Sequence, residues 1–369
     1  MQSLFALQQC KEANYELCLE MINDTFLPDL NSMEVQDKAL LNTQKRQAQK
    51  LFEKAFAEGE SKVDHEDDKI KKTVNTALKD YATQVKKDTQ FFLKTLISEC
   101  EKLYDQYISV LTLGGVFAEV AEGDKKVSHK NFYENLWLKA IRNSEILRKD
   151  ALRLNRHWQN NMDQVRLWFR DVVRQDAEYQ TYLDRKTLTL EDQKKFANHL
   201  FKRIILGKTT ISDYFEEEVM RWTEDKEIVK GLVEKTVKSF DPSAKDAVLT
   251  LHTLSLNWDD DKEFIEKLYS NASNLDERYK ELIANNTRNW EVDRLPLTDR
   301  IILEMAIAEF ISFPSIPVKV TINEYIELAK NYSTPKSRQF INGILDVISK
   351  ELKDTGAVKK SGRGLIDNK

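Results

Sequence analysis

The sequence predicts an all-α protein, and three observations support that prediction. Only 10 Gly and 6 Pro occur in 369 residues, too few for the many turns of a β-sandwich, a barrel or an α/β sheet protein. Charged residues make up 32% of the chain, and the mean hydropathy is −0.56. Apolar residues recur at helical spacing from residue 4 to about residue 352, whereas alternating strand patterns are scarce.

Three helices are expected before residue 125. The first contains the apolar residues at 4–7. The second has an apolar stripe along residues 40–56 and is expected to end at Gly59, because glycine adopts the left-handed conformation that ends many helices. The third is expected from about residue 73 to residue 120, with a break near Gly114-Gly115.

Several amphipathic helices are expected between residues 127 and 241. Four tryptophans lie there among apolar neighbours at helical spacing: Trp137, Trp158, Trp168 and Trp222. Such positions are typical of a hydrophobic core or of contacts between helices, rather than of platforms on which a nucleobase stacks.

The C-terminal quarter contains the clearest helical signals. Residues 297–310 leave almost no polar face, which predicts a helix buried on most sides. Thr321 and Glu324 have the spacing of a capping box. Ser333-Thr334-Pro335 offers a hydroxyl cap followed by proline at the first helical position. A last helix is expected to bury the apolar residues between 341 and 352.

No catalytic or metal-binding pattern is present in the sequence. A Gly-rich nucleotide loop, a nucleophile elbow and a histidine pair at zinc-ligand spacing are all missing. The acidic runs 66–68 and 259–261 precede apolar-periodic segments, where carboxylates stabilise helix N-termini. The cysteines, Cys10, Cys18 and Cys100, lack C-x-x-C spacing and are expected to be reduced. The sequence therefore predicts neither a metal nor a cofactor.

A cytoplasmic location without membrane contact is expected. The longest uncharged apolar stretch, residues 108–118, falls well short of the ~20 residues that a membrane helix needs. The first residues do not have the pattern of a secretory signal peptide.

The C-terminal end is the basic pole of the chain. Residues 336–369 hold eight Lys or Arg and four Asp or Glu, a net charge of +4 in a chain with a formal charge of −4. Lys336, Ser337 and Arg338 fall in the first turn of the last helix, where free N–H groups and the helix dipole favour a phosphate. Phe340 and Asn342 add an aromatic face and an amide for an unpaired RNA base. The alternative is that Phe340 packs inside and the basic residues merely solvate the helix end.

Linked sequence blocks occupy the C-terminal part of the chain in a fixed order. They are Trp290 with Asp293-Arg294-Leu295-Pro296, Asp299-Arg300, Ala308-Glu309-Phe310, Ile316-Pro317-Val318-Lys319-Val320, Ile322 to Lys330 and Phe340 to Asp346. Together they resemble the C-terminal half of the NusB transcription antitermination family. The opening Met1 to Leu7 resembles the first helix of that family, and Ser361 to Leu365 resembles the ending of its long, inserted members.

The resemblance implies an all-α fold of two small helical bundles without enzymatic activity. Members of the family bind the boxA element of nascent ribosomal RNA together with NusE, a small-subunit ribosomal protein, and help RNA polymerase resist termination. In this chain it implies an RNA surface at Lys336, Ser337, Arg338, Phe340 and Asn342. It also implies a NusE contact at Phe5 on the first helix and at Asp299 at the start of the buried helix.

The implied organisation is a family core that is split by an insertion. The expected divisions are residues 1–20 as the first helix of the NusB-like core, 21–125 as a long-helix insertion, 126–255 as an additional helical region, 256–355 as the NusB-like domain and 356–369 as a basic flexible tail.

Two features depart from the family pattern. The family has an arginine-rich arm before its first helix, whereas this sequence starts at Met1 inside the first-helix motif. We expect either an upstream start or weaker RNA binding, because affinity falls when fewer phosphates are bound. The position of Lys336 is often acidic in shorter relatives, and a basic residue there is expected to strengthen RNA contact.

Two other functions remain open from the sequence. One is a helical scaffold that uses the NusB-like domain for protein contacts only, with residues 20–255 as the main binding element. The other is an RNA-modifying enzyme, because NusB-like domains also occur fused to rRNA cytosine methyltransferases. The sequence disfavours the enzyme, because it lacks the Gly-rich loop and nucleophilic cysteine of such a catalytic domain.

Overall fold

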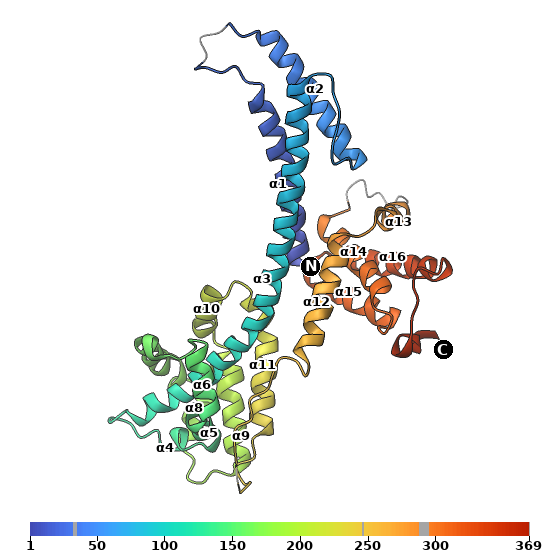
Figure 1. Cartoon of the computed structure of the whole chain (residues 1–369). Helices are drawn as coiled ribbons and strands as arrows, with labels where there is room; N and C mark the ends of the chain where they lie inside the picture. The colour runs from blue at the N-terminus through green and yellow to red at the C-terminus, as the bar shows by residue number, and fades with distance from the viewer. Residues whose placement is uncertain (32–34, 246, 288–294, 369) are drawn as a thin grey trace. The chain divides into compact units, whose positions relative to one another are not determined.

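The computed structural model describes residues 1–31, 35–245, 247–287 and 295–368. All regular secondary structure in these ranges is helical, with no strand, which confirms the predicted fold class (Figure 1). Backbone contacts divide the chain into two compact units. The core unit comprises residues 1–97 and 259–369, and the inserted unit comprises residues 98–258.

A three-helix cluster forms the first part of the core unit. It consists of α1 (Gln2–Thr25), α2 (Lys38–Glu58) and the beginning of α3 (Asp68–Glu122). Buried side chains from all three helices meet there, among them Ile22, Phe52 and Val74. The expected end of α2 is confirmed, because Gly59 adopts a φ of 71° and its N–H bonds back into the last turn.

A second cluster of the core unit is built from the C-terminal helices. They are α12 (Trp258–Ser273), α13 (Glu277–Thr287), α14 (Leu297–Ser312), α15 (Val318–Tyr332), α16 (Pro335–Asp354) and a final 3₁₀ helix (Gly362–Asn368). Leu4 and Leu7 of α1 join this cluster. Helix α14 is buried over most of its length, as its sequence predicts. The first helix thus belongs to the same core as the C-terminal helices.

One of the two expected helix starts is confirmed and the other is wrong. Thr334 caps α16, and Pro335 occupies its first position. The capping box at Thr321 and Glu324 does not form, because α15 already begins at Val318 after Pro317. Pro317 occupies the position just before the helix, where its fixed φ and its missing N–H fit a helix start. The hydroxyl of Thr321 instead donates to the carbonyl of Pro317 at 3.5 Å.

The inserted unit is an independent helical cluster around an aromatic core. After α3 it contains α4 (Lys130–Tyr133), α5 (Leu136–Asn143), α6 (Glu145–Arg153), α7 (Met162–Trp168), α8 (Ala177–Leu183), α9 (Leu190–His199), α10 (Thr209–Glu218) and α11 (Trp222–Ser239), with π-helical turns after α7 and α9. The tryptophans at 137, 158, 168 and 222 are all buried in this core, as expected. The indole N–H of Trp137 donates to Val237 O at 2.8 Å, and that of Trp158 donates to Ser109 O at 3.0 Å.

The expected break in α3 at Gly114-Gly115 is wrong, because the helix continues through both glycines to Glu122. Packing explains Gly114: a Cβ atom at that position would lie 2.6 Å from the ring of Phe201. The glycine therefore permits a close approach between α3 and the π-helical turn after α9, and it does not interrupt the helix.

The substitution Gly114→Ala is expected to lower the free energy of unfolding by about 1–3 kcal/mol, because it overpacks the core against an aromatic ring. The control is Gly231→Ala in α11, where a Cβ atom meets nothing within 4 Å. There alanine is expected to be neutral or stabilising by up to about 1 kcal/mol. Urea denaturation of both variants checks this, and equal stability of the two would contradict the packing role of Gly114.

The unit boundary differs in position from the divisions that the sequence suggests. It lies between residues 97 and 98, inside the continuous helix α3, rather than near residue 125. A boundary inside a helix needs no glycine or proline, so it leaves no mark in the sequence. In the described ranges, no helix has the length and apolar character needed to cross a bilayer.

Candidate nucleic-acid interface

The start of α16 is closed by its own cap. Thr334 Oγ1 accepts a hydrogen bond from the Ser337 N–H at 3.1 Å, and the Arg338 N–H donates to Thr334 O at 3.1 Å. Pro335 has no N–H. In this first turn, all of which is described, the Lys336 N–H is therefore the backbone donor left for an anion. A phosphate at this turn would therefore depend mainly on the charges of the side chains.

The predicted RNA residues lie together along the first two turns of α16. Lys336, Arg338 and Asn342 are exposed, whereas Ser337 and Phe340 are partly buried. Residues four apart on a helix are neighbours, so Lys336 lies beside Phe340 and Arg338 lies beside Asn342. Within the described ranges, neither Lys336 nor Arg338 forms an ion pair. Two unneutralised positive charges therefore stand next to an aromatic ring and an amide.

The ring of Phe340 is partly packed and partly exposed. It packs against the C-terminal cluster of the core unit, as the packing alternative requires, but it is not fully buried. Stacking of a base would use the part of the ring that remains exposed. Asp346 follows Asn342 by one turn and is exposed. A negative charge therefore lies directly after the basic residues at the start of α16.

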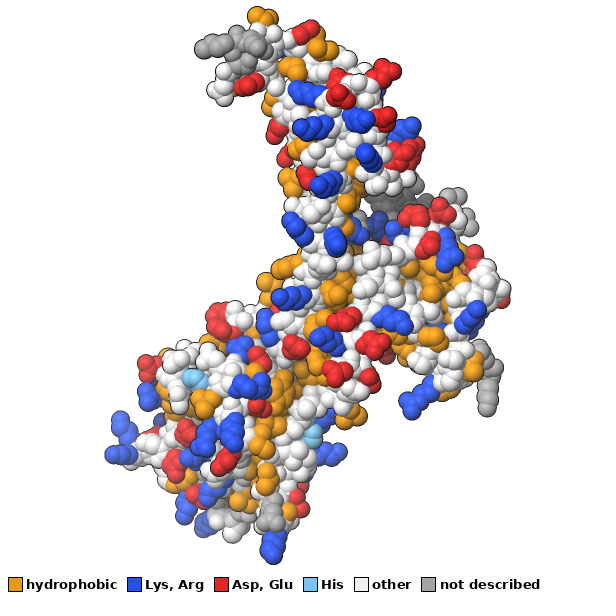
Figure 2. All heavy atoms as spheres, viewed as in Figure 1, with side chains coloured by type: hydrophobic (Ala, Val, Ile, Leu, Met, Phe, Trp, Pro, Cys, Tyr) orange, Lys and Arg blue, Asp and Glu red, His pale blue; other side chains and the backbone are white. Residues whose placement is uncertain are grey.

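The surface in Figure 2 shows acidic and basic side chains interspersed over the visible face. Interspersed charges favour a short, local contact with nucleic acid over a long electrostatic track. The start of α16 fits such a local contact, because it combines two charges with two groups that can contact a base.

The two residues implied in the NusE contact differ in accessibility. Phe5 on α1 is 38% exposed, whereas Asp299 at the start of α14 is 1% exposed. The carboxylate of Asp299 accepts a hydrogen bond from the hydroxyl of Ser333, which ties the start of α14 to the end of α15. A direct partner contact by Asp299 would need a rearrangement that exposes it, whereas Phe5 already presents apolar surface. Trp290, Asp293 and Arg294 of the family motif lie outside the described residues.

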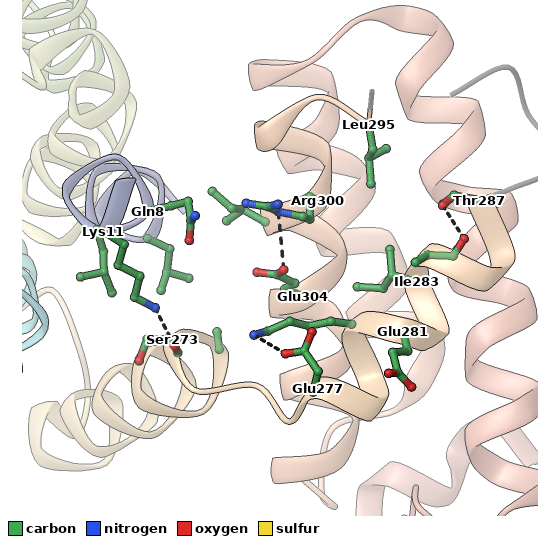
Figure 3. Close-up of a pocket in the computed structure, with 16 residues that line it drawn as sticks. Gln8, Lys11, Ser273, Glu277, Glu281, Ile283, Thr287, Leu295, Arg300 and Glu304 are labelled. Atoms are coloured by element: carbon green, nitrogen blue, oxygen red, sulfur yellow. Dashed lines mark hydrogen bonds and ion pairs between the residues drawn. The ribbon is translucent and has the colours of Figure 1, made fainter. Parts of the chain in front are cut away.

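A cavity of 520 Å³ lies beside α1 and is lined by α12, α13 and α14 (Figure 3). Its apolar wall includes Leu4 and Leu7, and its charged groups come from Lys11, Lys280, Arg300 and Glu304. Lys11 Nζ donates to Ser273 O at 3.3 Å, and Arg300 Nε lies 3.7 Å from Glu304 Oε1. Burial raises the pKa of the Glu304 carboxyl and lowers the pKa of the Lys11 ammonium group.

Sequence reasoning missed this charged cluster. Its members lie on α1, α13 and α14, of which α1 is distant in sequence from the other two, and only the packing of these helices brings them together. One indication of this cluster was present in the sequence: a family core that is split by an insertion predicts that the first helix packs against the C-terminal helices. Among the described residues, no group of three or more His, Cys, Asp or Glu is placed to hold a metal ion. The acidic run 259–261 lies in the first turn of α12, as expected.

Comparison with known proteins identifies the family. Residues 232–350 match the NusB family. The transcription antitermination protein NusB of Salinibacter ruber is 39% identical over 138 residues, which cover 36% of this chain and 86% of that protein. The proteins of the same name from Chloroherpeton thalassium and Koribacter versatilis are 38% and 41% identical over 141 and 100 residues. These matches cover 38% and 27% of this chain, and 62% and 68% of the two relatives.

No solved structure matches the chain significantly. The match to the Salinibacter ruber protein, at 39% identity, covers most of that protein. The chain belongs to the NusB family.

Proposed function

We propose that this protein is a transcription antitermination factor that binds boxA-type RNA of ribosomal RNA transcripts together with NusE. Its mechanism is assembly: it holds RNA and NusE near RNA polymerase within an antitermination complex and thereby supports rRNA transcription. The relatives named above are transcription antitermination proteins, and the exposed basic start of α16 is the observation that supports RNA binding most directly.

Each part of this surface has a distinct task in the proposal. Lys336 and Arg338 attract the phosphates of an unpaired RNA segment, and these contacts provide affinity that depends on salt. Asn342 offers a donor and an acceptor to a base edge, and Phe340 offers the exposed part of its ring. Phe5 lies on α1 and supplies apolar surface for NusE.

Fluorescence anisotropy of a labelled boxA-type RNA tests the proposal. The RNA is titrated with this chain and equimolar NusE at two salt concentrations, and a scrambled RNA serves as the control. We expect tighter binding of boxA than of the scrambled RNA, and weaker binding at the higher salt concentration. Equal affinity for both RNAs would contradict sequence-specific recognition.

A scaffold that binds proteins only is the second candidate. The inserted unit favours it, because it has a hydrophobic core of its own and is large enough to present a separate binding surface. The same titration separates the two functions, provided that NusE binding is measured in parallel. Binding of NusE without saturable binding of any RNA would favour the scaffold.

A further inference from the structure

A small cavity in the inserted unit is lined mainly by polar side chains. The cavity has a volume of 210 Å³ and lies between α3, the segment 155–161 and α10. Gln106 and Ser109 of α3 line it one turn apart, and they are only 3% and 7% exposed. Within the described ranges, the Gln106 amide and the Ser109 hydroxyl form no hydrogen bond with the protein. Both residues line the cavity, so the amide and the hydroxyl are available to a ligand.

The segment that faces α3 adds further polar side chains to the cavity wall. Arg156 Nε and His157 Nδ1 are buried and have no hydrogen-bond partner. Asn155 precedes them with a φ of 53°, the left-handed region that a non-glycine residue adopts rarely. This conformation places three polar side chains in succession at the cavity wall.

The charge of the cavity wall is nearly balanced. Arg156 Nε lies 3.8 Å from Asp105 Oδ2, so the guanidinium already faces a carboxylate. Glu218 adds a negative charge at an exposed position of the lining. A free phosphate or carboxylate would therefore gain little here, and the remaining groups suit a neutral ligand that both donates and accepts hydrogen bonds.

We propose that this cavity binds a nucleobase, which belongs either to an unpaired RNA nucleotide or to a free nucleoside. Primary amides such as those of Gln106 and Asn155 pair with base edges, because each presents a donor beside an acceptor. Tyr214 and Asn161 also line the cavity, and the Tyr214 hydroxyl accepts a hydrogen bond from the Asn161 amide at 2.7 Å. The volume is below the about 300–1,000 Å³ of pockets for drug-sized ligands, which suits one or two fused rings. The inference concerns the inserted unit and does not depend on the surface of α16.

Calorimetric titration of the full chain with adenosine, guanosine, cytidine and uridine tests the proposal, with glucose as a polyol control. We expect saturable binding of at least one nucleoside, with a Kd of about 1 mM or tighter. Gln106→Leu is expected to weaken that binding about tenfold, the effect of one hydrogen bond. Gln84→Leu changes an exposed glutamine of the same helix and is expected to leave binding unchanged. Absence of nucleoside binding, equal binding of glucose or an unaffected Gln106→Leu variant would overturn the proposal.

Thermal unfolding of Gln106→Leu separates a ligand contact from a structural role. Because the amide has no partner in the free protein, leucine is expected to leave the unfolding midpoint unchanged or to raise it. A lower unfolding midpoint for Gln106→Leu would show that the Gln106 amide has a structural role. The binding test would then be repeated with Ser109→Ala, which removes one oxygen atom, and unchanged nucleoside affinity in that variant would overturn the proposal.

A competition experiment identifies the source of the base. A short single-stranded RNA of the preferred base is titrated against the bound nucleoside. If the RNA displaces the bound nucleoside at a lower concentration than free nucleoside does, the cavity is assigned to RNA. Displacement only at an equal or higher concentration assigns it to the free nucleoside. The Lys336→Glu, Arg338→Glu variant is expected to bind nucleoside as the unchanged chain does, even if it no longer binds RNA. The two proposed sites can therefore be tested independently.

Discussion

The double variant Lys336→Glu, Arg338→Glu is expected to bind boxA-type RNA about 10- to 100-fold more weakly than the unchanged chain at moderate salt. Each reversal removes a positive charge that we propose to face a phosphate, and it adds a repulsive charge at the start of α16. The slope of log affinity against log salt is expected to fall by about 0.7 for each phosphate of single-stranded RNA that is no longer neutralised. Anisotropy titrations at several salt concentrations measure both quantities.

A matched variant controls for the change in total charge. Lys350→Glu with Lys353→Glu reverses two exposed charges on the same helix, but near its other end. We expect this variant to keep most of the RNA affinity. Because Lys336 and Arg338 are exposed, circular dichroism and the unfolding midpoint of their variant should stay close to those of the unchanged chain. An equal drop in affinity in both double variants would show a general charge effect and would remove the assignment of the site.

The substitution Tyr325→Phe is expected to lower the free energy of unfolding by about 1.5–3 kcal/mol at neutral pH, the range for hydrogen bonds to charged groups. The hydroxyl of Tyr325 donates to Glu309 Oε2 at 3.0 Å, and both residues are almost fully buried. Removal of the hydroxyl leaves the carboxylate with less compensation for its burial. Urea denaturation at pH 7 measures the effect, and a change near zero would contradict it.

The pH dependence of this pair gives a sharper test. Burial raises the pKa of Glu309 above its ordinary value, so the folded state binds the proton more tightly than the unfolded state. The stability that this provides is complete below the ordinary carboxyl pKa of about 4.3 and is lost as the pH rises through the raised pKa. Glu309→Gln removes this titration and keeps an acceptor for Tyr325. Relative to the unchanged chain, it is expected to gain stability between about pH 4 and pH 7, and a relative loss over that range would contradict the direction of the shift.

Local rules predicted several features of the C-terminal helices correctly. Continuous apolar composition predicted that α14 is buried, and a hydroxyl followed by Pro335 predicted the start of α16. These features depend on a few neighbouring residues, so the sequence contains the whole signal. The sequence also predicted that the five residues of the proposed RNA surface share the first turns of one helix, because they lie within seven positions of each other.

Features that depend on tertiary packing could not be predicted in the same way. Gly114 reads as a helix breaker, but its role follows from Phe201, which is distant in sequence. Asp299 reads as an exposed acidic residue at a helix start, but Ser333 and the surrounding helices enclose it. The cavity at Gln106 requires α3, the segment after α6 and α10 together. In each case a contact between distant segments overrides the local pattern.

Read-through of a terminator is the direct measure of an antitermination role. RNA polymerase transcribes a template with boxA upstream of a terminator, and this chain is added together with NusE. An antitermination role predicts more read-through transcript with intact boxA than with scrambled boxA, and loss of that gain in the Lys336→Glu, Arg338→Glu variant. Equal read-through with and without the chain, on a boxA template with active NusE, would contradict an antitermination role.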